Sequence, residues 1–209
     1  MKSVVRTLFH TVAAAAVITV ATGLPAQAAI NFTVGNNPQT DENVLLNNGM
    51  TGPSVVGNTN MTGTPVMFSS TIDTLSAPSN GQARVEATDG LVNNISISVP
   101  GNSYQTLIFN PFDGDGTLFV SVLSNMGISN FNYGIGNGQN FLTIVASGGE
   151  KILNTTLNAA DGFQDLRQIR IGGFEPLEEQ PPSSVPEPAS MALLGMGALP
   201  LLRRLRRRR

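Results

Sequence analysis

The sequence predicts an all-β protein, an antiparallel β-sandwich or jelly roll, flanked by an N-terminal signal helix and a C-terminal transmembrane helix. Apolar and polar residues alternate over several short stretches, which is the pattern of half-buried strands. Breaks rich in Gly and Asn separate these stretches at intervals of about ten residues, as in β-sandwiches. Between residues 29 and 173 there is no long stretch of 3.6-residue apolar periodicity, so we expect no long helix there.

The first 28 residues have the three parts of a secretory signal peptide. Two basic residues come first, residues 12–21 form the apolar segment, and Ala26-Gln27-Ala28 is a small-residue cleavage site. The apolar segment is short for an uncleaved membrane anchor. We therefore expect signal peptidase to cut after Ala28, so that the mature chain begins at Ala29.

The exported body is predicted to be one β-sandwich domain over residues 29–173. Within Leu91–Pro100, the side chains of Ile95, Ile97 and Val99 share one face, and serines occupy the other. Asp89-Gly90 separates two alternating runs and predicts a hairpin turn. Further strands are expected at Pro65–Ser69, Tyr104–Asn110, Thr117–Leu123, Phe141–Ala146, Ile152–Leu157 and Leu166–Ile171.

The charge of the body excludes one class of partner. From residue 29 to 184 the chain has thirteen acidic residues and four basic ones (Arg84, Lys151, Arg167 and Arg170), a net charge of −9. Such a body cannot neutralise a run of phosphates, so we expect no nucleic-acid partner.

Residue types also exclude most catalytic chemistry. The signal peptide contains the only histidine, His10, and the chain has no cysteine. The mature protein would therefore lack Ser-His-Asp and Cys-His catalysis and the usual zinc and copper ligands. Carboxylate chemistry stays open, because Glu86 with Asp89, or Asp161 with Asp165, would supply the acid pair of a glycoside hydrolase. These acids border turns, where acids are common, so we expect no catalytic residue and no enzyme activity.

Calcium is the one metal for which the sequence offers candidate ligands. Asp113 and Asp115 lie in a Gly-rich loop and could present carboxylate oxygens. The EF-hand pattern fails, because Thr117 and Ser124 occupy positions where that pattern needs ligands. An ordinary turn between two strands is the preferred interpretation, so no cofactor is expected.

The C-terminal end has four ordered parts. Residues 174–184 form an acidic, Pro-rich linker, and Pro186-Glu187-Pro188 follows it. Residues 189–202 are apolar apart from one serine and would form a helix of about 21 Å, short of a hydrocarbon core of about 30 Å. Basic residues then hold that end in the cytoplasm. This basic cluster consists of Arg203, Arg204, Arg206, Arg207, Arg208 and Arg209.

The prolines keep the segment before the apolar helix extended, which suits it to a protease. The arrangement over residues 185–209 resembles the PEP-CTERM sorting signal of Gram-negative bacteria, also catalogued as the ice-binding protein C-terminal domain. The resemblance implies that an exosortase, a membrane transpeptidase-like enzyme, reads Pro186, Glu187 and Pro188 and cuts nearby. It also implies an intermediate anchored in the inner membrane, followed by the cell surface or the extracellular space.

We therefore expect a non-enzymatic protein of the cell surface or extracellular matrix. Its partners would be signal peptidase, an exosortase-type enzyme and the inner membrane before processing. Two alternatives stay open: a carbohydrate-binding or adhesive module, with or without calcium, whose partner is exopolysaccharide, and a carboxylate-dependent hydrolase.

Overall fold

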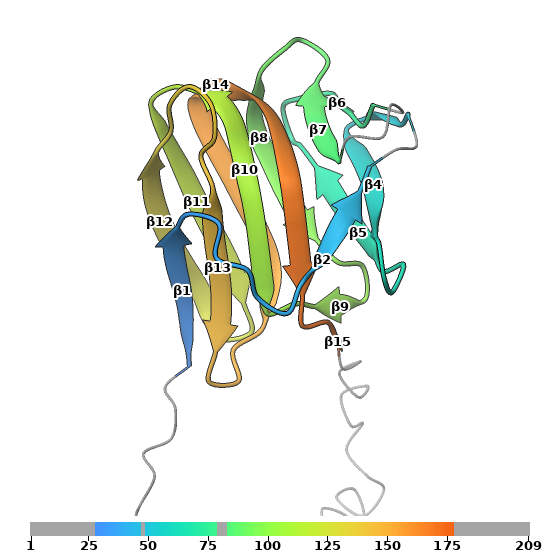
Figure 1. Ribbon diagram of the computed structural model, residues 1–209, viewed down its shortest axis with the longest axis vertical. Helices are drawn as coiled ribbons and strands as arrows, with labels where there is room; N and C mark the ends of the chain where they lie inside the picture. The colour runs from blue at the N-terminus through green and yellow to red at the C-terminus, as the bar shows by residue number, and fades with distance from the viewer. Residues whose placement is uncertain (1–27, 47–48, 79–82, 178–209) are drawn as a thin grey trace, which may run out of the picture.

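The computed structural model describes residues 28–46, 49–78 and 83–177 (Figure 1). The predicted signal peptide up to residue 27, the Pro-Glu-Pro motif, the apolar segment and the arginine cluster lie outside these residues. The described part contains strands and no helix, and its paired strands are antiparallel, which confirms the all-β class. No helix capable of spanning a membrane is found in this part of the chain.

The strands are β1 (Ala29–Val34), β2 (Glu42–Leu45), β3 (Thr51–Gly52), β4 (Ser54–Thr59), β5 (Pro65–Ser69), β6 (Leu75–Ser76), β7 (Arg84–Ala87), β8 (Val92–Ser98), β9 (Asn102–Ser103), β10 (Thr106–Gly114), β11 (Thr117–Ser124), β12 (Gly127–Gly134), β13 (Leu142–Ser147), β14 (Ile152–Gly172) and β15 (Glu175–Pro176).

Two layers of strands enclose the core, and β14 belongs to both. The front layer contains β1, β13, β10 and the C-terminal half of β14, and the back layer contains β12, β11, the N-terminal half of β14, β8, β5 and β4 (Figure 1). Ala159 of β14 pairs with β11 of the back layer, whereas Phe163 pairs both with Gly114 of β10 in the front layer and with Val92 of β8 in the back layer. Between them, Gly162 has a φ of +75°, which favours glycine at this bend.

One side of the sandwich is closed and the other is open. On the closed side, β2 pairs with both β14 and β4, and β5 and β8 complete the ring back to β14. On the open side, β1 pairs with β13 and β12 with β11, and neither has a second neighbour among the described residues. Phe32 of β1 and Phe131 of β12 stack across this opening, with their ring centroids 5.0 Å apart.

The core follows the predicted alternation. Ile95, Ile97 and Val99 are buried between the layers, as expected. The bounds of β5 are those predicted, and β10, β11 and β13 overlap the predicted strands. The two strands expected at Ile152–Leu157 and Leu166–Ile171 are the two halves of β14.

The hairpin predicted at Asp89-Gly90 is wrong in its pairing. The turn itself forms, since the Gly90 amide donates to the Ala87 carbonyl at 3.1 Å. However, β7 pairs with the C-terminal half of β14 and β8 with its N-terminal half, so the turn joins the two layers. The strands separate because β14 bends between the residues that each of them contacts.

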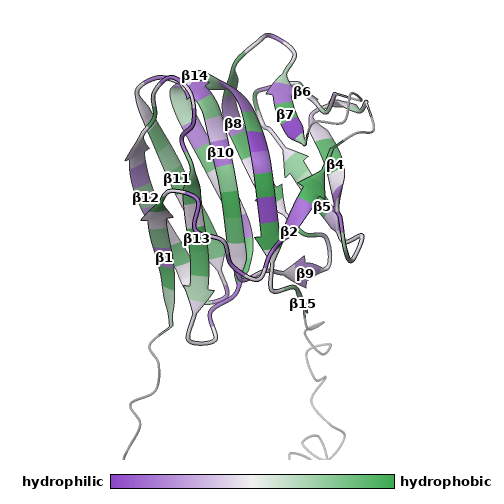
Figure 2. Cartoon of the chain, in the orientation of Figure 1, coloured by the Kyte–Doolittle hydropathy of each residue, from purple (hydrophilic) through white to green (hydrophobic). Residues whose placement is uncertain are grey.

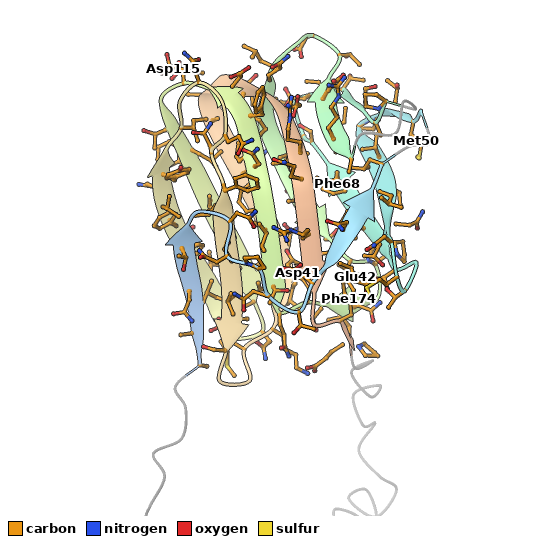
Figure 3. The ribbon with its side chains drawn as sticks, in the orientation of Figure 1. Asp41, Glu42, Met50, Phe68, Asp115 and Phe174 are labelled. Atoms are coloured by element: carbon orange, nitrogen blue, oxygen red, sulfur yellow. The ribbon has the colours of Figure 1, made fainter. Side chains whose placement is uncertain are left out.

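The body also extends beyond residue 173, into the segment assigned to the linker. Glu175 and Pro176 of β15 pair with β9, and Phe174 packs against the core. Glu175 forms an ion pair with Lys151. Both described ends of the chain leave the sandwich at the same end, and Asp115 lies at the opposite end (Figures 1 and 3).

Candidate functional site

A groove with a cavity volume of about 540 Å³ lies on the outer face of the front layer. It is bounded by the loop after β1, by β2 and by the C-terminal half of β14, and Figure 2 shows hydrophilic bands on this half and on β7. The volume is in the range of small-ligand sites. The residues that line it are Asn36, Asn43, Leu45, Ala83, Arg84, Phe141, Arg167, Gln168 and Arg170.

Three of the four basic residues of the body converge on this groove. Arg84 comes from β7, and Arg167 and Arg170 come from β14. Arg84 lies directly opposite Arg167 in the strand register. Their side chains are 22–26% exposed, so a ligand in the groove can reach them. No acidic residue is among the lining residues, and the fourth basic residue, Lys151, pairs with Glu175 elsewhere.

Arg167 is held in place by a buried carboxylate and an aromatic ring. Its Nε donates to Oδ1 of Asp165 at 2.5 Å, and its Nη2 donates to Oδ2 of the same fully buried residue. The hydrogen bonds with Asp165 raise the pKa of the Arg167 guanidinium above its ordinary value, against the effect of burial. Its central carbon lies 3.5 Å from the centroid of the Phe112 ring, a cation–π contact. The guanidinium is therefore charged and fixed.

The other two arginines also have carboxylate partners outside the lining of the groove. Arg84 Nε lies 2.6 Å from Oε1 of Glu86, and Arg170 Nη1 lies 4.0 Å from Oδ1 of Asp41. Arg170 also donates to the side-chain oxygen of Asn36, in the loop that crosses the front layer. A guanidinium has five N–H donors. These partners orient the arginines and leave further donors for a ligand.

A β-bulge places Gln168 between the two arginines of β14. Ile108 pairs with Arg170 and Asn110 with Arg167, so two residues of β14 lie opposite one residue of β10. Gln168 has a φ of +53°, in the left-handed region that non-glycine residues seldom adopt. Buried Asn110 donates to Gln168 Oε1 at 2.8 Å and accepts from the Asn140 amide at 2.7 Å. This network aims the polar side chains of β14 at the groove.

The structure groups the candidate acids differently from the two pairs considered. Glu86 lies opposite Asp165 in the register of β7 and β14, and both contact arginines. Asp89 lies in the exposed turn after β7, and Asp161 is exposed at the bend of β14. The groove is therefore lined by guanidinium groups. The carboxylates that pair with them are not among its lining residues.

The two candidate calcium ligands accept backbone hydrogen bonds at the end of the sandwich labelled by Asp115 in Figure 3. Asp113 Oδ1 accepts from the Gly138 amide at 2.6 Å, and Asp115 Oδ1 accepts from the Gly116 amide at 2.8 Å. In the described ranges, no three metal-ligating side chains group around a common point. Asp113 thereby links the end of β10 to the loop between β12 and β13, and Asp115 bonds within the turn between β10 and β11.

The groove was not predicted from the sequence, although the rarity of basic residues in the body was a usable signal. The other predicted site residues belong to the termini. Ala28 is the first described residue and Ala29 begins β1, whereas Ala26, the Pro-Glu-Pro motif and the arginine cluster lie outside the description.

Comparisons with known proteins give distant structural neighbours for the body. A search of curated proteins gives no match. Two CBM29-2 variants, from work on family 29 carbohydrate binding modules, are 14% and 13% identical to this chain, with a TM-score of 0.26 each. The alignments cover 71% and 70% of this chain and 90% and 91% of those chains. A third variant, complexed with cellulohexaose, is 14% identical over 69% of this chain and 89% of its own, with a TM-score of 0.26.

A likeness this distant does not assign a function. Residues 184–208, in contrast, match the family model of the PEP-CTERM protein-sorting motif. This motif implies export, processing by exosortase-type sorting machinery and a surface or extracellular location. The chain carries a PEP-CTERM protein-sorting motif at its C-terminal end.

Proposed function

We propose that this protein is a non-enzymatic surface or matrix protein whose arginine groove binds a carboxylate-bearing polysaccharide. The observation that carries the proposal is the convergence of Arg84, Arg167 and Arg170 on one groove with no acidic lining residue. Arginine is otherwise absent between residues 29 and 184 of the chain. The planar guanidinium matches a carboxylate in a bidentate manner, better than lysine does.

The other lining groups suit a sugar. Asn36, Asn43 and Gln168 offer amide donors and acceptors for hydroxyl groups, and Leu45 and Phe141 offer apolar contact to a sugar ring. The acidic body repels a polyanion at long range, so the ligand must be held by close contacts. The paired carboxylates behind the arginines supply the rigidity that such contacts need.

The proposal includes maturation at both ends of the chain. Signal peptidase cuts after Ala28, the apolar segment and arginines hold a membrane-anchored intermediate, and an exosortase-type enzyme reads Pro186, Glu187 and Pro188. The body then reaches the cell surface or the polysaccharide matrix. No cofactor is required, and calcium at Asp113 and Asp115 is not part of the binding mechanism.

The test is a binding titration of the mature protein with polygalacturonate and alginate, with dextran as the uncharged control. We expect saturable binding to at least one of the two acidic polymers, and we expect added salt to weaken it. A hydrogen bond to a charged group contributes about 1.5–3 kcal/mol, so Arg84→Gln/Arg170→Gln should weaken binding at least tenfold. Arg167 is kept, because its loss would strand the buried Asp165.

Lys151→Gln is the matched control, since it removes a basic residue outside the groove. It should leave the affinity unchanged. Lys151→Gln removes one positive charge and the double variant removes two, so a loss of binding free energy that is equal per charge removed would show that only net charge matters. No binding to either acidic polymer would refute the groove. Release of reducing ends from any of the three polymers would contradict the non-enzymatic assignment.

A further inference from the structure

The open side of the sandwich presents two unpaired strand edges. Among the described residues, β12 has β11 as its one neighbour, and β1 has β13. Figure 1 shows both edges on the same side of the molecule. The outer edge of such a strand carries backbone N–H and C=O groups that can pair with another strand. In the described part of the chain, the opposite side of the sandwich offers no comparable edge, because β2 links its two layers.

Neither edge has the features that usually prevent pairing. Exposed edges are commonly protected by charged residues, prolines, bulges or very short strands. β12 is eight residues long, with the sequence GISNFNYG, and β1 is six residues long, with the sequence AINFTV. Neither sequence contains a charged residue or a proline, although the body carries a net charge of −9. The pairing of β12 with β11 continues without a bulge from Gly127 to Gly134.

Exposed apolar side chains gather beside the β12 edge. Ile128 is 66% exposed, and Met126 in the preceding turn is 63% exposed. On the neighbouring strand, Phe119 and Leu123 are 49% and 44% exposed. A partner that extends the back layer beyond β12 would cover part of this apolar surface.

We propose that the partner is a second copy of this chain, whose β12 pairs antiparallel with the first β12 about a two-fold axis. Such an interface is isologous, because each copy presents the same strand to the other. Two acidic bodies can associate only through surfaces that do not place like charges opposite each other. An uncharged strand such as β12 meets this condition when it pairs with its own copy. The back layers of the two copies then form one continuous sheet. The arginine groove lies on the front layer near β2 and β7, so the proposal is independent of glycan binding.

Charge introduced at the edge tests the interface. Asn130 and Asn132 are exposed on the outer face of β12, so Asn130→Lys/Asn132→Lys brings lysines together when two β12 strands pair. By sedimentation equilibrium, the mature wild-type protein should form dimers, and the double variant should dissociate about tenfold or more readily. Ser54→Lys/Asn58→Lys is the matched control, with the same charge at two exposed positions of β4 on the same layer at the closed side. It should dimerise like the wild type.

Crosslinking provides a second measurement that tolerates a folding defect in the lysine variant. The chain has no cysteine, so Asn130→Cys introduces a unique thiol at the edge. A short bis-maleimide should join two Asn130→Cys chains at concentrations where Ser54→Cys chains, with a likewise exposed thiol on the closed side, stay separate. A wild-type protein that is monomeric at all concentrations, or equal crosslinking at both positions, would overturn the proposal. Loss of glycan binding with dimerisation intact would instead affect only the proposed function.

Discussion

Tyr104 provides a stringent test of the core, because its hydroxyl is buried between the layers. The hydroxyl oxygen lies 2.8 Å from Thr155 Oγ1 and donates to the Ile97 carbonyl at 3.3 Å. Burial raises the pKa of Tyr104 well above its ordinary value of 10, and the hydrogen bond with Thr155 opposes this shift only in part. In the unfolded chain the ring is hydrated and ionises near pH 10.

The sign and size of the pH effect follow from this difference. The folded pKa is raised, so the contribution of Tyr104 to stability is fully present below pH 10 and is lost as the pH rises from 10 toward the folded pKa. The free energy of unfolding should fall by about 1.4 kcal/mol for each pH unit in that window. Two pH units would remove about 3 kcal/mol, a large part of the 5–15 kcal/mol typical of a domain.

The assay uses the absence of tryptophan and the presence of only two tyrosines. Tyr133→Phe leaves Tyr104 as the single source of tyrosinate absorbance. We expect that absorbance to appear above pH 10 only in step with the loss of the far-ultraviolet circular dichroism of the strands. Tyrosinate that forms near pH 10 while the strand signal is intact would refute the buried position. Tyr104→Phe should cost about 1–2 kcal/mol at neutral pH, because Thr155 loses a partner, and should remove this pH dependence.

Three further predictions use other parts of the chain. Gly57→Ala should lower the free energy of unfolding by about 1–3 kcal/mol, since its Cβ would lie 2.8 Å from the Leu45 carbonyl oxygen. Gly134→Ala is the control, because its Cβ would meet nothing within 4 Å. Equal denaturation midpoints for the two variants would contradict this prediction. EDTA and added calcium should leave the melting temperature unchanged, because Asp113 already accepts the Gly138 amide; a calcium-dependent rise would establish a site. Glu187→Ala should leave export and cleavage after Ala28 intact, but a membrane form that retains Arg203 to Arg209 should accumulate. Fractionation and C-terminal mass spectrometry would detect this form. Release at the wild-type rate would show that the Pro-Glu-Pro motif acts only as a spacer.

Much of the fold could be predicted because strand burial is a local property. The alternation in Leu91–Pro100 identifies the buried face of β8, and Pro65–Ser69 gives the bounds of β5. β12 was missed although Asn130 and Asn132 alternate with Phe131 and Tyr133, because its Asn and Gly residues are uncommon in strands and are typical of turns. The Asp89-Gly90 turn was predicted, but its pairing was not, because pairing depends on where distant β14 bends.

The groove could not be predicted for the same reason. Arg84 is far from Arg167 and Arg170 in the sequence, and the cross-strand register of β7 and β14 alone brings them together. The bulge that places Gln168 at the groove arises from a shift in the register between β10 and β14. The sequence of neither strand shows this shift by itself.

The sequence by itself determined the β class of the body, the sorting motif, the absence of cysteine and the absence of any histidine after residue 10. Each of these depends on residue type, on local spacing or on a short linear motif that is read in extended form. The tertiary structure decided which strands are neighbours, where the three arginines meet and which side of the sandwich stays open. Alternation specifies which face of a strand is buried, but the choice of neighbour comes from packing between segments far apart in the chain.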